Sequence, residues 1–137
     1  MIDRKDVCIL GLGYIGLPTA ALMASKGFNV VGVDTNKEVV KKINKGIIHI
    51  DEPGLEHVVR ETVLNKKLRA SAHPTIADVY IICVPTPFKN IASNNTPSPD
   101  ISYVLSATYS ISSLVKPGDT VILESTSPVG TTHKVQE

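Results

Sequence analysis

The sequence is short of the features that several protein classes require. Its 137 residues include no tryptophan and two cysteines, Cys8 and Cys83, which lie 75 positions apart. Two cysteines are too few for a disulfide scaffold and do not have the spacing of metal ligands, so no metal site is expected. Apolar runs of four to six residues are far below the roughly 20 that cross a bilayer, so we expect no membrane segment.

The chain also lacks an excess of either charge. It has 14 Lys and Arg against 13 Asp and Glu, and a formal net charge of +1. Since both signs are spread along the chain, no basic face could neutralise a run of phosphates, and nucleic acid is not an expected partner. Residues 1–6 are charged and lead directly into an apolar segment, unlike a secretory signal peptide. The length suits one domain, and we expect it to be cytoplasmic.

Apolar patterning predicts both strands and helices. Continuous runs rich in β-branched residues predict strands buried on both faces, at residues 7–10, 30–33, 79–84 and 121–123, with a weaker strand at 68–71. Apolar residues at helical spacing predict helices between them, within residues 17–27, 36–46, 53–63 and 101–115. Strands that alternate with helices imply right-handed crossovers. We therefore expect an α/β fold with a doubly wound parallel sheet in three layers, α/β/α.

A glycine-rich motif, G-x-G-x-x-G, occupies residues 11–16 between the first predicted strand and the first predicted helix. The motif alone is weak evidence, but this position is typical of a Rossmann-like dinucleotide site. Gly11 can form the tight turn, Gly13 lets the backbone approach a pyrophosphate, and Gly16 lets the helix and strand pack closely. The helix N-terminus offers unpaired N–H groups and a positive dipole end to the phosphates.

An acidic residue, Asp34, ends the second predicted strand 18 residues after Gly16. In Rossmann-like folds an acid at this position holds the adenosine ribose. A carboxylate accepts hydrogen bonds from the ribose hydroxyls and repels a 2′-phosphate, so we expect NAD rather than NADP as the cofactor. The alternative is that Asp34 is only a turn residue beside Asn36, the predicted N-cap of the next helix.

Four segments resemble the UDP-glucose/GDP-mannose dehydrogenase family. They occupy residues 11–20, 48–55, 83–88 and 124–132. The first segment is shared with many dehydrogenases, whereas the last two in one chain are specific to this family. Their detail is closer to the members that act on UDP-N-acetyl-mannosamine than to those that act on UDP-glucose.

The resemblance implies that residues 1–137 are the NAD-binding Rossmann domain of a longer enzyme, cut before the sixth strand of the sheet. Members of the family oxidise the C6 alcohol of a nucleotide sugar to the carboxylate and reduce two NAD. A UDP-sugar would bind through a missing domain, the whole enzyme would be a homodimer, and this piece alone would be inactive. The alternatives are an NAD-sensing regulatory domain of a potassium-transport system, a dehydrogenase of UDP-glucose or UDP-N-acetyl-glucosamine, or a dehydrogenase of small β-hydroxy acids.

Residue by residue, the resemblance implies cofactor contacts at Tyr14, Ile15, Asp34, Thr86 and Thr126. The two threonines each follow a predicted strand, which places their hydroxyls near the nicotinamide end, and the alternative for both is turn capping. The proline-rich stretch 85–99 reads as an irregular loop at the same edge of the sheet.

No catalytic residue is expected within the chain. Cys8 and Cys83 lie in apolar strands, where burial raises the pKa of a thiol and makes it inert. Glu124 is a lone carboxylate at a strand end and is expected to be structural. The four histidines do not have the spacing of metal ligands.

Overall fold

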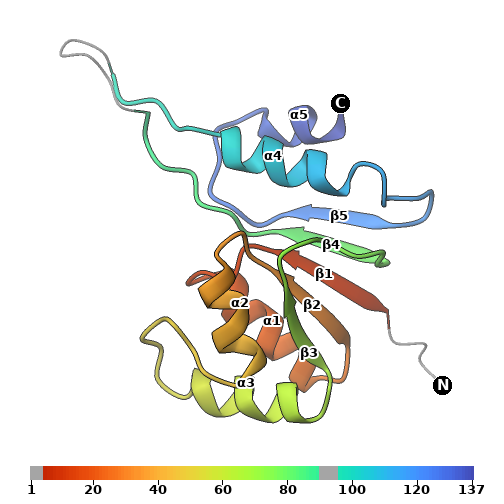
Figure 1. Cartoon of the computed structure of the whole chain (residues 1–137). Helices are drawn as coiled ribbons and strands as arrows, with labels where there is room; N and C mark the ends of the chain where they lie inside the picture. The colour runs from red at the N-terminus through yellow and green to blue at the C-terminus, as the bar shows by residue number, and fades with distance from the viewer. Residues whose placement is uncertain (1–4, 90–95) are drawn as a thin grey trace.

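Residues 5–89 and 96–137, which the computed structural model describes, contain a five-stranded parallel sheet. Its strands are β1 (Asp6–Leu10), β2 (Asn29–Val33), β3 (Leu68–Ser71), β4 (Val79–Ile82) and β5 (Thr120–Leu123). They are arranged in the order β3-β2-β1-β4-β5 (Figure 1). β2 and β3 are added on one side of β1, and β4 and β5 are added on its other side. The boundary between β1 and β4 is therefore the switch point of a doubly wound sheet. All five predicted strands are confirmed in position, although β4 ends at Ile82 rather than at residue 84. The prediction that the last of them is buried on both faces is wrong, because β5 lies at the edge of the sheet and its Val121 and Ile122 are 37% and 42% exposed.

The helices of the described residues cover both faces of the sheet. They are α1 (Gly16–Ser25), α2 (Lys37–Asn44), α3 (Leu55–Leu64), α4 (Ser102–Ile111) and α5 (Thr131–Gln136). The helices α1, α2 and α3 lie on one face, and α4 and α5 lie on the other (Figure 1). Each face has its own apolar core, with Leu17 and Val59 in the first and Tyr80 and Val104 in the second. The predicted three-layer α/β/α arrangement is therefore confirmed.

Of two predicted helix starts, that of α2 is confirmed and that of α3 is not. Asn36 caps α2 as predicted, because its Oδ1 accepts a hydrogen bond from the Glu38 N–H at 3.0 Å. The prediction that the third helix starts at Pro53 is wrong. Gly54, with a φ of 81°, is the N-cap, and the helix begins one residue later. Gly54 enters the helix in the left-handed conformation, which glycine adopts without strain.

The fourth helix is shorter than predicted, because α4 ends at Ile111 and does not reach residue 115. Serine hydroxyls near its end donate to helix carbonyls, Ser110 to Ala107 at 2.7 Å and Ser112 to Tyr109 at 2.9 Å. Such bonds compete with the backbone hydrogen bonds of a helix and favour its termination.

The predicted irregular loop after β4 begins and ends as an antiparallel ribbon. Phe88 pairs with Pro99, and the N–H of Lys89 donates to the carbonyl of Ser98 at 2.8 Å. The ribbon leads away from the sheet (Figure 1). The central part of the predicted loop, residues 90–95, lies outside the described residues. Apart from this short pairing, residues 85–87 and 96–98 adopt no regular structure, so the prediction of an irregular loop is confirmed there.

Candidate functional site

The glycine-rich segment forms a sharp turn between β1 and α1. Gly11 has a φ of 98°, and a Cβ at this position would lie 2.5 Å from the carbonyl oxygen of Cys83. A Cβ at Gly16 would overlap the carbonyl oxygen of Gly11. Gly13 differs from both, because a Cβ there would meet nothing within 4 Å. Gly11 and Gly16 are therefore required by packing within the turn, whereas Gly13 borders open space.

The N-terminus of α1 has a chemistry that suits an anion. Its N-cap residue, Ile15, makes no side-chain capping bond, and the first turn contains no acidic residue. The first N–H groups of a helix have no partner within the helix, and they form the positive end of its dipole. Tyr14 and Ile15 are 65% and 56% exposed at this end. A phosphate group could therefore bind the first turn of α1 through backbone N–H groups.

The carboxylate of Asp34, at the end of β2, contacts the glycine turn directly. Its Oδ2 accepts a hydrogen bond from the Leu12 N–H at 3.1 Å, and its Oδ1 accepts one from the Asn36 N–H at 2.9 Å. The Gly11 N–H also donates to the carbonyl of Val33 at 2.8 Å. A carboxylate has about four lone-pair sites, so Asp34 can still accept hydrogen bonds from hydroxyl groups of a ligand. The turn and the acid thus form one continuous site.

Thr86 and Thr126 come together at the ends of β4 and β5. Their Oγ1 atoms are 2.9 Å apart, and either hydroxyl can be the donor. Ser125 secures this arrangement, because its hydroxyl donates to the carbonyl of Val84 at 2.8 Å. The hydrogen bond joins two segments that follow neighbouring strands, so it does more than cap a local turn. The two predicted threonines therefore form a hydroxyl pair at the carboxyl edge of the sheet.

Cys83 and Glu124 form a contact that the sequence analysis did not predict. The thiol of Cys83 donates to Oε2 of Glu124 at 3.2 Å, and the hydroxyl of Thr19 donates to Oε1 at 3.3 Å. Burial raises the pKa of Cys83 to about 12, and the bond to Glu124 adds to this effect. Burial also raises the pKa of Cys8. Both thiols are therefore protonated near neutral pH, as expected of inert core cysteines. Through its two hydrogen bonds, Glu124 connects α1 to the end of β4.

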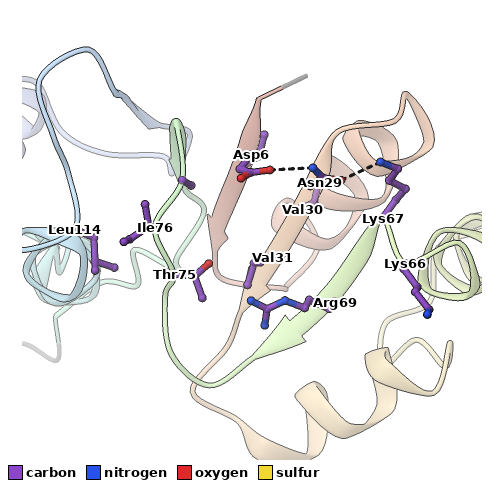
Figure 2. Close-up of a pocket in the computed structure, with 12 residues that line it drawn as sticks. Asp6, Asn29, Val30, Val31, Lys66, Lys67, Arg69, Thr75, Ile76 and Leu114 are labelled. Carbon is purple, nitrogen blue, oxygen red and sulfur yellow. Dashed lines mark hydrogen bonds between the residues drawn. The ribbon is translucent and has the colours of Figure 1, made fainter. Parts of the chain in front are cut away.

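A hollow of about 580 Å³ lies at the opposite, amino edge of the sheet and contains none of the predicted cofactor residues. Figure 2 shows a series of hydrogen-bonded polar side chains on the wall of this hollow. Lys67 Nζ donates to Asn29 Oδ1, and Asn29 Nδ2 donates to Asp6 Oδ1, both at 2.9 Å. These bonds connect the starts of three strands, β1, β2 and β3. A second hollow, of about 900 Å³ between α4, α5 and β5, also contains none of the predicted residues.

Among residues 5–89 and 96–137, no three His, Cys, Asp or Glu side chains lie close enough together to hold a metal ion. No helix in those residues has the length and apolar character needed to cross a membrane.

The strand order and the contact between a glycine turn and an acid define a Rossmann-like dinucleotide-binding domain. Comparison with known families gives a more specific result. The NAD-binding domain of the UDP-glucose/GDP-mannose dehydrogenase family matches residues 5–137. The chain therefore belongs to this family, and its cofactor is NAD. Family membership favours a dehydrogenase over a regulatory domain of a potassium-transport system.

Several relatives are similar to this chain over nearly its whole length. The UDP-N-acetyl-D-mannosamine dehydrogenase of Campylobacter jejuni is 50% identical over 98% of this chain and 32% of that protein. The enzyme of the same name from Escherichia coli K12 is 52% identical over 96% of this chain and 30% of that protein. A solved structure of UDP-N-acetyl-mannosamine dehydrogenase from Staphylococcus aureus has a TM-score of 0.85 and 40% identity, and the match covers 96% of this chain and 32% of that one. The chain thus spans about a third of the length of the curated relatives it matches.

Proposed function

We propose that this chain binds NAD across the carboxyl edge of its sheet. The pyrophosphate would bind the turn at residues 11–16 and the first turn of α1, and the adenosine ribose would bind Asp34. The observation that carries the proposal is the 3.1 Å hydrogen bond between Asp34 and the backbone of Leu12. This bond supports the proposal because it holds the turn at residues 11–16 and the Asp34 carboxylate close enough together for one dinucleotide to contact both.

The side chains around the turn fit the charge of NAD. The open space at Gly13 leaves room for phosphate oxygens, and the first turn of α1 carries no acid that would repel them. Asp34 would accept hydrogen bonds from the 2′- and 3′-hydroxyls of the ribose. A 2′-phosphate would instead place negative charge against this carboxylate, which favours NAD over NADP.

The remaining predicted residues would hold the other half of the cofactor. The hydroxyl pair of Thr86 and Thr126 follows β4 and β5, beyond the switch point, and would border the nicotinamide ribose or ring. Tyr14 and Ile15, exposed at the N-terminus of α1, would cover the cofactor on its solvent side. When bound, NAD accepts the hydride that leaves the substrate.

For the whole enzyme we propose a cytoplasmic, homodimeric UDP-N-acetyl-mannosamine 6-dehydrogenase. It would convert the C6 alcohol to the uronate in two oxidations, consuming two NAD and one water per sugar. Residues 1–137 would be its cofactor domain, and other domains would bind the UDP-sugar and supply the catalytic groups. The names of the relatives and the one-third coverage of their length support this division. On its own the 137-residue chain would bind NAD and oxidise no sugar.

One relative supports a second substrate. The NDP-N-acetyl-D-galactosaminuronic acid dehydrogenase of Ralstonia nicotianae is 46% identical over 99% of this chain and 31% of that protein. Identity within a cofactor domain reports kinship, because the residues that discriminate between sugars belong to the part that binds the sugar. An N-acetyl-galactosamine nucleotide is therefore the alternative substrate.

Steady-state kinetics of the whole enzyme would test the substrate. We expect a higher kcat/KM for UDP-N-acetyl-mannosamine than for the UDP derivatives of N-acetyl-galactosamine, N-acetyl-glucosamine and glucose. We also expect two NADH per sugar consumed. A higher kcat/KM for another sugar would contradict the substrate assignment and leave the cofactor site unaffected. One NADH per sugar would contradict the double oxidation.

A further inference from the structure

The side chain of Leu12, within the glycine turn, points into the protein rather than toward the cofactor edge. Leu12 is fully buried, in contrast to the exposed Tyr14 two residues later. It lies over Gly32 of β2. A Cβ at Gly32 would be 2.5 Å from Cδ2, 3.0 Å from Cδ1 and 3.2 Å from Cγ of Leu12. The leucine therefore occupies the space that any side chain at residue 32 would need.

The backbone conformation of Gly32 does not explain why this position is a glycine. Six glycines of the described residues have a positive φ, and Gly32 is not among them. It pairs in regular parallel register with Ile9 of β1 and with Ala70 of β3. A glycine inside a strand weakens the strand, and it often marks a close approach by another part of the chain. Here the group that approaches is the side chain of Leu12.

The glycine turn is thus held at three consecutive positions at the end of β2. Gly32 receives the Leu12 side chain, the carbonyl of Val33 accepts from the Gly11 N–H, and the carboxylate of Asp34 accepts from the Leu12 N–H. The hydrogen bonds donated by the Gly11 and Leu12 N–H groups fix the direction of the turn, but each tolerates some displacement. The atoms that a Cβ at residue 32 would meet belong to the Leu12 side chain, and because Leu12 is fully buried this side chain has little room to rotate away. The contact therefore limits how deeply the turn sits against the sheet.

We propose that Leu12 and Gly32 are positioning residues for NAD binding, which hold the phosphate-binding turn at its working distance from Asp34. This proposal rests on the proposed function of the turn. A methyl group at residue 32 would push Leu12 outward, and the shift would carry the Leu12 N–H away from Asp34 and move the backbone at Gly13. The ribose acceptor and the pyrophosphate turn would then no longer match the length of one dinucleotide.

The variants Gly32→Ala, Leu12→Ala and the double variant test this proposal by calorimetric titration with NAD and by thermal unfolding. We expect Gly32→Ala to raise the Kd for NAD about tenfold, within the range of coupling between contacting residues. Leu12→Ala should raise the Kd less, because the hydrogen bonds donated by the N–H groups of residues 11 and 12 remain. The double variant should bind no more weakly than Leu12→Ala, since the clash is absent once Leu12 is shortened.

A matched control separates positioning from a general loss of stability. Ile111→Val removes one methylene from the core on the other face of the sheet, where Ile111 is 1% exposed. It should lower the unfolding temperature and leave the Kd for NAD unchanged. If Gly32→Ala lowers the unfolding temperature and leaves the Kd unchanged, the contact serves stability alone and the proposal is wrong.

The double variant gives a second way to overturn the proposal. If the fold-changes of the two single variants multiply, the residues act independently and do not form one contact. Titration of the wild-type chain distinguishes a failure of the proposal from a failure of the proposed function. A wild-type chain that does not bind NAD would overturn both, whereas binding with no effect of Gly32→Ala would overturn only the positioning role.

Discussion

Replacing Asp34 by alanine should weaken NAD binding strongly and weaken NADP binding much less. Hydrogen bonds to a charged acceptor contribute about 1.5–3 kcal/mol, which corresponds to a rise of about 12- to 150-fold in the Kd for NAD. For NADP, the loss of these bonds is offset because the negative charge that repels the 2′-phosphate is also removed. The ratio of the two affinities should therefore shift toward NADP.

The same substitution also removes two bonds within the protein, and these need a control. The Leu12 and Asn36 N–H groups would each lose their bond to Asp34, at a cost of about 1.5–3 kcal/mol per bond because the acceptor is charged. Asp78 offers a comparable case at the amino edge, because its Oδ2 accepts from the Asp6 N–H at 2.8 Å. Asp78→Ala should lower stability in a similar way and leave the affinities for both cofactors unchanged.

Isothermal titration of the wild type, Asp34→Ala and Asp78→Ala with NAD and with NADP measures these effects. Chemical denaturation of the same proteins gives the loss of stability. Equal fold-losses for NAD and NADP in Asp34→Ala would show that the carboxylate does not contact the ribose. Equal losses in Asp34→Ala and Asp78→Ala would show that the effect comes from stability, and either result would refute the assignment of Asp34.

Three further predictions concern the glycine turn, the buried thiol and the edge of the sheet. Gly16→Ala should destabilise the fold by at least ~1–3 kcal/mol, the cost typical of overpacking, because its Cβ would overlap a backbone carbonyl. Gly13→Ala should fold normally and bind NAD more weakly, and thermal melts with NAD titration distinguish the two variants. Labelling of Cys83 in the folded protein should be about a thousandfold slower than labelling of a free thiol, since a pKa of about 12 leaves little thiolate. The labelling rate should rise tenfold per pH unit up to a pH near 12, and fast labelling at pH 8 would contradict the burial of this thiol. Asn44→Ala should destabilise the domain by about 1–3 kcal/mol in urea denaturation, because the Asn44 amide forms hydrogen bonds with both the N–H and the carbonyl of Ala70 on the edge strand β3. An unchanged free energy of unfolding would show that water fully replaces the Asn44 amide.

Local sequence was sufficient to predict the strands and the positions of the turns. Buried parallel strands are continuous apolar runs, so residues 7–10 and 30–33 could be identified without a structure. The roles of Gly11 and Gly16 could also be predicted, since the motif fixes their positions relative to a strand and a helix. The glycines that shape the turn of the candidate site can therefore be identified from the sequence.

Contacts between distant residues could not be predicted in the same way. The hydrogen bond of Cys83 to Glu124 joins positions 41 residues apart, and it depends on the pairing of β4 with β5. Gly32 resembles any small residue in an apolar strand until the structure shows Leu12 above it. Proline is favoured at the first helical position, which predicts a helix start at Pro53, but the left-handed Gly54 sets the actual start.

The location of the cofactor site is the central claim, and backbone amide chemical shifts measured by NMR during titration with NAD test it most directly. We predict that the largest shift changes fall at residues 11–16, Asp34, Thr86 and Thr126, and that they saturate with a single Kd. The amides of Asn29, Lys67 and Arg69, which line the hollow at the amino edge, should change little (Figure 2). Changes concentrated at that hollow, or no saturable change at residues 11–16, would contradict the account.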